Sequence, residues 1–338
     1  MSLLQVAELA GVSPATVSKV VNNYPSVSKA NIDRVREAMR QLQYQPSARK
    51  RSSSSKISKL PVAVLIVHTD MFHHYASTCS LMMSGVEEAL RDRDLDLIVA
   101  HVAKAKDLPL AVSNRQISGL VLIGHDPSSD VIGKIEGIPT VWLTSHHDVK
   151  GDMMLAGNES VGRLAAEYLI DRRHNNLAVL NILPSNPAIK LRIDYFNFVA
   201  SSANCQVKTY LSNQTKMQRL HNGLDLYLLE NLVSEVVDQY LAEPGCATGL
   251  FVPHDMIVAM VYRVLEKRGI KPNDQLEIIG CDDEKAALIG LYPRPATIHI
   301  GAKLMGQRAV EQLFWRIGNR VEQQRVRVMV EPELVPGD

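Results

Sequence analysis

Apolar residues recur at helical spacing in three stretches within the first 45 residues of the chain. The first stretch follows a Ser-x-x-Gln capping box at residues 2–5 and is itself followed by Gly11. Its apolar face would consist of Leu4, Val6, Ala7, Leu9 and Ala10. We therefore predict a helix that ends in a left-handed glycine.

A second short helix is predicted from Pro14 to about Asn22, because Ser13 is a natural N-cap and proline suits the first helical position. Its inward side would consist of Val17, Val20 and Val21. Ser28 then caps a third predicted helix over roughly 29–42, whose core face would consist of Ile32, Val35, Met39 and Leu42.

Two short helices joined by a tight turn with glycine form a helix-turn-helix unit, in which the second helix enters the DNA major groove. The exposed candidates for base contacts are Pro14, Ala15, Thr16, Ser18 and Lys19. Ala15 would touch a thymine methyl group and Lys19 would donate to guanine, while Ser13, Thr16 and Asn22 would contact phosphates. A generic three-helix bundle would share this apolar pattern, but the small, polar and cationic outer face favours DNA binding.

From Pro61 onward, short apolar runs alternate with helical stretches. We predict strands at 62–67, 95–99, 120–123, 140–143, 177–183, 250–252, 276–281 and 326–330, and helices at 76–93, 158–172, 188–202, 225–242, 255–268 and 302–317. Such alternation predicts an α/β fold with parallel sheets, which bind ligands outside the carboxyl ends of their strands.

Length and composition fit a soluble protein of two or three folding units, since the chain has 338 residues and is 46% hydrophobic. No apolar run is long enough to cross a bilayer and the start does not look like a secretion signal, so we expect a cytoplasmic protein. The four cysteines are scattered, which argues against disulfides or a zinc site. The adjacent pair His73-His74 has no carboxylate at helical spacing, and we expect neither a metal nor a cofactor.

Charge is unevenly distributed along the chain. Residues 1–59 hold ten basic and three acidic residues, a net charge of +7, whereas the remaining 27 basic and 33 acidic residues give −6. A basic head on an acidic body indicates a head that meets a polyanion. The segment 47–60 is rich in serine and basic residues and predicts a flexible linker.

The run Val6–Asn22, together with Val27-Ser28 and Tyr44-Gln45-Pro46, resembles the head of the lac repressor (LacI/GalR) family of bacterial transcription regulators. The resemblance continues over nearly the whole chain. It implies a helix-turn-helix domain at 1–46, a hinge at 47–60, and a two-lobed effector-binding and dimerisation domain at 61–338 that is similar to periplasmic sugar-binding proteins. Lobe one would be about 61–143 and 273–300, and lobe two about 144–272 and 301–338.

The same resemblance implies a repressor that binds near-palindromic operator DNA as a homodimer and responds to a small-molecule effector, most simply a sugar, a sugar phosphate or a nucleoside-like compound. The chain end lacks the heptads with which some members form tetramers. Two hinge positions differ from the family: Ser53 replaces the leucine that wedges into the minor groove, and Lys50 replaces a small residue. Either the hinge forms a helix that contacts phosphates through Arg49, Lys50 and Arg51, or it remains a charged tether. Lys19 stands where the family usually has arginine.

By resemblance, the effector contacts in the second lobe would be Asn158, Arg192, His254 and Asp282. The loop after the first strand would contribute Thr69, Asp70, Phe72 and Tyr75 from the other lobe. The arginine fork suits hydroxyls, carboxylates or phosphates. We interpret Asp255 as the N-cap of its helix rather than a ligand contact.

Three other functions are compatible with parts of this sequence. An enzyme is disfavoured because no nucleotide-binding, nucleophile-elbow or zinc-protease motif is present. A periplasmic binding protein would need a leader and would not need the head. A DNA-binding protein that has lost its ligand remains open, because His254, Gly157 and Cys281 depart from the family pattern.

Overall fold

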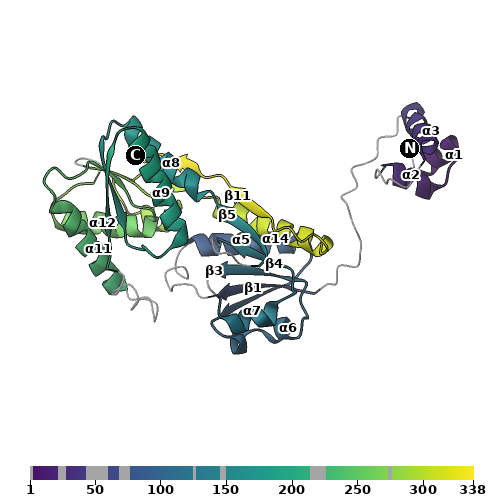
Figure 1. Cartoon of the computed structure of the whole chain (residues 1–338), viewed down its shortest axis with the longest axis horizontal. Helices are drawn as coiled ribbons and strands as arrows, with labels where there is room; N and C mark the ends of the chain where they lie inside the picture. Colours follow the sequence, from purple (N-terminus) through teal and green to yellow (C-terminus); the bar gives the residue numbers. More distant parts are fainter. Residues whose placement is uncertain are drawn as a thin grey trace. The chain divides into compact units, whose positions relative to one another are not determined.

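The structure is a computed structural model of the chain (Figure 1), and it describes residues 3–21, 28–42, 60–67, 77–124, 127–144, 150–213, 226–272 and 276–338. The chain divides into two compact units, Met1–Ile57 and Ser58–Asp338. No helix among the described residues is both long and apolar enough to cross a membrane.

The first unit consists of three helices, α1 (Leu3–Ala10), α2 (Pro14–Val21) and α3 (Lys29–Gln41). Their shared core is built from Val6, Ala7, Ala10, Val17, Val20, Val35 and Ala38, with Ile32, Met39 and Leu42 partly buried. Gly11 ends α1 with a φ of 60°, and the Val12 amide donates to Ala7 O at 3.0 Å, as the sequence predicted. The prediction for Leu9 was wrong, because this side chain is 51% exposed.

The first lobe of the second unit contains a six-stranded parallel sheet. Its strand order is β11 (Arg327–Val330), β5 (Asp152–Ala156), β4 (Thr140–Leu143), β3 (Gly119–Gly124), β1 (Val62–Val67) and β2 (Leu97–Val102). Every residue of β1 is buried, because alternate side chains join two cores on opposite faces of the sheet. The continuous apolar run at 62–67 therefore predicted a strand buried on both sides correctly.

Helices α5 (Ser77–Arg91) and α14 (Ala302–Gly318) pack side by side on one face of this sheet. The short helices η1 (Ala105–Asp107), α6 (Leu110–Ser113) and α7 (Ser129–Ile135) lie on the other face (Figure 1). The contact between α5 and α14 is so close that a Cβ atom on Gly85 would lie 2.0 Å from Lys303 O. Gly85 therefore permits an approach that any other residue would block.

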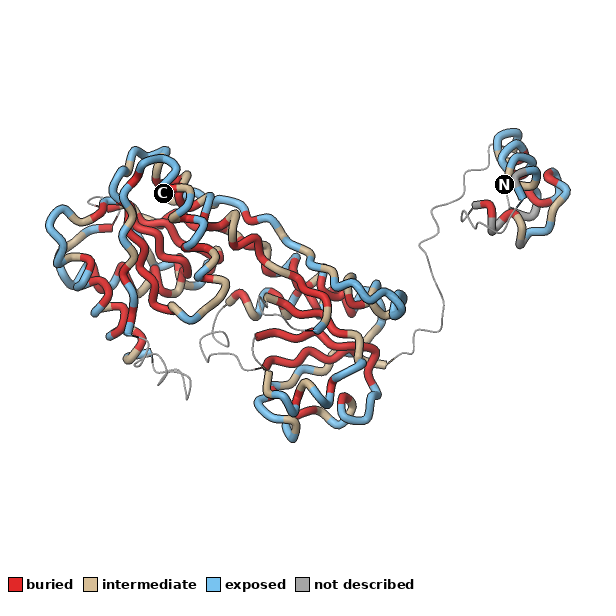
Figure 2. Tube along the Cα trace, in the orientation of Figure 1, coloured by how far each residue is buried: buried red, intermediate tan, exposed pale blue. Residues whose placement is uncertain are grey.

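The second lobe contains a four-stranded parallel sheet with the order β7 (Gln206–Leu211), β6 (Asn176–Asn181), β8 (Gly249–Phe251) and β9 (Glu277–Ile279). Helices α8 (Asn158–Asp171) and α9 (Pro187–Ser202) pack together, as do α11 (Leu226–Leu241) and α12 (Asp255–Lys267). The short helix α13 (Lys285–Leu288) contacts α12. In both lobes the buried residues follow the strands and the exposed residues form the outer helix faces (Figure 2).

The predicted lobe boundaries were wrong in three places. Segment 273–300 was assigned to lobe one, but β9 pairs with β8 in the second sheet. Segment 301–338 was assigned to lobe two, but α14 packs on α5 and β11 pairs with β5 in the first sheet. Strand β5, inside the segment 144–157 that was assigned to lobe two, pairs with β4 of the first sheet and was not predicted as a strand.

A buried ion pair accounts for the position of these C-terminal elements. Asp152, at the start of β5, is 1% exposed and accepts from Arg316 Nε at 2.9 Å and from the Val326 amide at 3.0 Å. It thereby joins α14 and the segment before β11 to the first sheet. The chain then continues into β12 (Glu333–Val335), which pairs antiparallel with β10 (Thr297–His299).

Candidate ligand pocket and nucleic-acid interface

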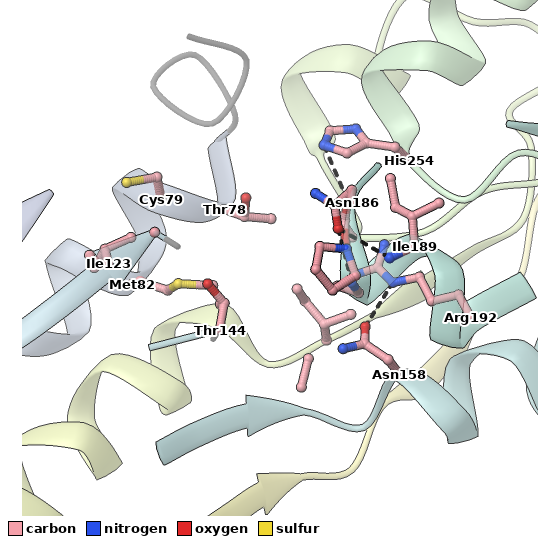
Figure 3. Close-up of a pocket in the computed structure, with 16 residues that line it drawn as sticks. Thr78, Cys79, Met82, Ile123, Thr144, Asn158, Asn186, Ile189, Arg192 and His254 are labelled. Carbon is pink, nitrogen blue, oxygen red and sulfur yellow. Dashed lines mark hydrogen bonds and ion pairs between the residues drawn. The ribbon is translucent and has the colours of Figure 1, made fainter. Parts of the chain in front are cut away.

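A pocket lies where the carboxyl ends of the strands of the two lobes face each other, as parallel sheets predict (Figure 3). The first lobe and the crossings contribute Thr78, Cys79, Met82, Ile123, Gly124, Thr144, Ala156 and Ile300. The second lobe contributes Asn158, Asn186, Pro187, Ala188, Ile189, Arg192, His254 and Asp282. The pocket thus combines apolar walls with a compact group of polar side chains.

Arg192 is the centre of that polar group. Its guanidinium is buried and donates from Nε to Asn158 Oδ1 at 2.9 Å and from Nη1 to Pro253 O at 2.7 Å. Nη2 lies 2.9 Å from Asp282 Oδ1. Burial alone would lower the pKa of Arg192, but the Asp282 carboxylate outweighs burial and raises it. The same ion pair outweighs burial at Asp282 and lowers the pKa of its carboxyl, so both groups are charged.

His254 is the N-cap of α12, since its Nδ1 accepts from the Met256 amide at 3.3 Å. Its Nε2 lies 3.6 Å from Asp282 Oδ2. Burial lowers the pKa of the imidazole, which is therefore neutral at pH 7 with its proton on Nε2. The interpretation of Asp255 as the N-cap was wrong, because the histidine before it takes that role.

Asp255 instead lies at the first position of α12 and is fully buried. Its carboxylate accepts from the Thr297 hydroxyl at 2.7 Å and from the Glu284 amide at 2.9 Å. Burial, reinforced by the nearby Asp282, raises the pKa of Asp255 well above its ordinary value. This residue supports the pocket floor from behind and does not line the pocket.

The backbone at Asp282 has a φ of 102° and that at Asp283 a φ of 52°. Both values lie in the left-handed region that side chains rarely adopt, and such outliers cluster at ligand sites. The Asp282 amide donates to Ile298 O at 2.9 Å, which fixes this turn and directs the carboxylate to Arg192. Asp283 Oδ2, by contrast, lies 3.1 Å from His299 Nδ1.

Glu284 connects the second lobe to the first lobe beside the pocket. Its side chain contacts Ser77 and Thr78 at the start of α5, and Oε1 has no hydrogen-bond partner among the described residues. The residue is 3% exposed, and burial, followed by the charge of Asp282, raises the pKa of Glu284 to about 7. Glu284 was not predicted as a site residue, since nothing in the run Asp-Asp-Glu distinguishes it from a solvated acid.

Of the eight predicted effector residues, the structure brings together Asn158, Arg192, His254 and Asp282. The other four, Thr69, Asp70, Phe72 and Tyr75, lie outside the described residues. The apolar walls were also missed, including Met82, because apolar residues on a helix show only its periodicity and not what they face.

In the first unit, α2 begins at Pro14 as predicted, and Ser13 caps it because its Oγ accepts from the Thr16 amide at 3.2 Å. Ser13 and Pro14 are exposed, and Thr16 is half-buried. The inward residues Val17 and Val20 are buried. Of the other predicted DNA contacts, the side chains of Ala15, Ser18 and Lys19 and the whole of Asn22, Arg49, Lys50 and Arg51 lie outside the described residues.

Comparison with known families gives two matches. Residues 2–47 match the family described as bacterial regulatory proteins, lacI family, and residues 166–338 match the periplasmic binding protein-like domain. The first match covers the three-helix unit, and the second covers most of the second lobe and the return of the chain to the first.

Among curated proteins, the HTH-type transcriptional repressor PurR of Vibrio cholerae is 26% identical over 349 residues, spanning 100% of this chain and 97% of the relative. The ribose operon repressor of Escherichia coli is 26% identical and spans 99% of this chain and 98% of the relative.

Solved structures show the same fold. The transcriptional regulator CelR in complex with cellobiose aligns with a TM-score of 0.67 at 20% identity, covering 100% of this chain and 99% of that one. The lac repressor dimer bound to operator and the anti-inducer ONPF aligns with a TM-score of 0.63 at 20% identity, covering 100% and 98%.

Proposed function

Because this chain belongs to the lacI family of bacterial regulatory proteins, we propose that it represses transcription as a homodimer whose operator affinity changes when a sugar-like effector enters the pocket between its lobes. The chain is a DNA-binding transcription regulator and not an enzyme. We place its action in the cytoplasm, where the chromosome lies. The observation that supports effector binding most directly is the buried group of Asn158, Arg192 and Asp282 at the pocket wall.

On the DNA side, α2 is proposed to lie in the major groove. Val17 and Val20 pack into the core of the three-helix unit, so the first turn of α2 is directed away from that core. We propose base contacts by Pro14, Ala15, Ser18 and Lys19, and phosphate contacts by Ser13, Thr16 and Asn22. Basic residues 49–51 are proposed to contact phosphates whether or not the hinge forms a helix.

On the ligand side, a guanidinium next to a carboxylate suits hydroxyl groups, which both donate and accept hydrogen bonds. Relatives support a sugar: one is named for the ribose operon, and two aligned structures contain cellobiose and ribose. We propose that ligand binding stabilises one relative arrangement of the lobes and so shifts the population that is competent for DNA.

The decisive experiment selects DNA fragments from random sequence with the full-length chain and then measures affinity for the selected sequence with and without sugars. We expect a near-palindromic sequence to be enriched, and at least one sugar to change its dissociation constant by at least fivefold. A folded chain that enriches no sequence would refute the regulator function. A chain that enriches a sequence but responds to no compound would refute effector binding alone.

A further inference from the structure

The polar wall of the pocket is electrically balanced. Among the described residues that line it, only Arg192 and Asp282 carry a charge, and their charged atoms lie 2.9 Å apart. His254 completes the group as a neutral ring. Among the described lining residues, the one cation is therefore already paired with the one anion.

The same group retains hydrogen-bonding capacity of both kinds. A guanidinium has five N–H groups, and three of those of Arg192 are directed to Asn158, Pro253 and Asp282. Each Nη thus keeps one N–H beyond those contacts. Asp282 Oδ1 accepts from Arg192 and from the Cys281 thiol, and Oδ2 lies 3.6 Å from His254 Nε2, which leaves Oδ2 a further lone pair. A hydroxyl group can use this donor and this acceptor at once.

The same polar group disfavours an anionic ligand. A phosphate or carboxylate that reached the Arg192 donors would lie beside the Asp282 carboxylate, and a buried charge without its own counter-charge is strongly disfavoured. The first lobe contributes uncharged side chains that offer no counter-charge, among them Met82, Ile123 and Ile300.

We propose that the pocket selects an uncharged, hydroxyl-bearing ligand and rejects the phosphorylated or carboxylate-bearing form of the same compound, with Asp282 as the residue that imposes this selection. The proposal rests on the proposed function, since it concerns the ligand of that same site. The expected effector class is thereby narrowed from sugars, sugar phosphates and nucleoside-like compounds to the uncharged members of that set.

Matched pairs of compounds test the proposal on the full-length chain. Thermal shift and calorimetric titration would compare D-ribose with ribose 5-phosphate, D-glucose with glucose 6-phosphate, D-galactose with D-galacturonate, and adenosine with adenosine monophosphate. We expect at least one neutral compound to bind at least 100-fold more tightly than its charged partner. Equal or tighter binding of a charged partner overturns the selectivity proposal and leaves the regulator function intact. Binding of none of the eight compounds counts against the proposed effector binding itself.

A single variant separates selectivity from folding. Asp282→Asn keeps the size of the side chain, and asparagine tolerates the left-handed backbone found there. It removes the negative charge, so we expect the preference for the neutral compound to fall at least tenfold. Asp283→Asn is the matched control, because Asp283 has the same type of backbone but pairs with His299 and does not line the pocket. Unchanged selectivity in Asp282→Asn, with normal operator binding, would overturn the role assigned to Asp282.

Discussion

Replacement of Glu284 by glutamine should stabilise the protein above neutral pH. Glu284 is 3% exposed, and its carboxyl has a pKa raised from the ordinary 4.5 to about 7, first by burial and then by Asp282. A raised pKa means that the ionised form is less stable in the folded chain than in the unfolded chain. Below pH 4.5 the group is protonated in both states and has no effect. Between pH 4.5 and 7 it destabilises the fold progressively, and above pH 7 the effect is constant.

The size of the effect follows from the difference between the two pKa values. Each pKa unit corresponds to about 1.4 kcal/mol, so full ionisation destabilises the folded chain by about 3 kcal/mol at pH 8 and by less than about 1 kcal/mol at pH 5. Glutamine has the shape of the protonated acid and removes this effect. Its carbonyl oxygen can still accept from the start of α5, where Ser77 and Thr78 lie.

The assay is denaturant unfolding of the wild type, Glu284→Gln and Glu331→Gln at pH 5 and pH 8, with the last variant as a control at an exposed position. We expect Glu284→Gln to gain about 3 kcal/mol at pH 8 and little at pH 5, and the control to change little at either pH. A variant that is less stable than wild type at pH 8, or equally stabilised at both pH values, would refute the assignment of a strained ionised carboxylate.

Three further predictions concern other positions. Gly85→Ala should destabilise the chain by at least about 2 kcal/mol in urea unfolding, because the added methyl would collide with α14. The control Gly133→Ala adds a methyl in open space on α7 and should be neutral or stabilising by about 0.5–1 kcal/mol. Asp152→Ala should cost about 3–5 kcal/mol in the same assay, because it removes the buried carboxylate that accepts from Arg316 and from the Val326 amide. The expected cost is less than about 1 kcal/mol for Glu87→Ala in an exposed pair, and equal effects would contradict the importance of burial. Lys19→Ala should relax sequence preference in operator binding, and a loss confined to the salt dependence would instead make this lysine a phosphate contact.

Local signals in the sequence predicted local structure well. The glycine at position 11, the serine cap at 13 and the apolar run at 62–67 each depend on neighbouring residues only, and each element has its predicted place. Local signals do not, however, predict which sheet a strand joins. The run at 276–281 predicts a strand, but its pairing with β8 is set by contacts with residues about 28 positions earlier, which periodicity does not encode.

At the candidate site, the identity of the residues could be predicted from the sequence, but their contacts could not. Resemblance to a family identified Asn158, Arg192, His254 and Asp282, and the structure brings these residues together. The pairing of Arg192 with protein acceptors could not be predicted, since it depends on the carbonyl oxygen of Pro253 and on the left-handed turn at Asp282. The connection made by Glu284 across the lobes depends on how the two lobes face each other.

Because the chain is synthesised from its N-terminus, the C-terminal elements determine when the first lobe is complete. The four strands of the second lobe are all synthesised by residue 279, so that sheet can form as soon as β9 emerges. The first lobe begins earlier but lacks α14 until residue 318 and β11 until residue 330. Until then, α5 presents Gly85 to solvent and one face of β1 lacks part of its cover. The lobe that is made first is therefore completed last, and a nascent chain that ends at residue 301 would hold all four strands of the second-lobe sheet while the first lobe still lacked α14 and β11.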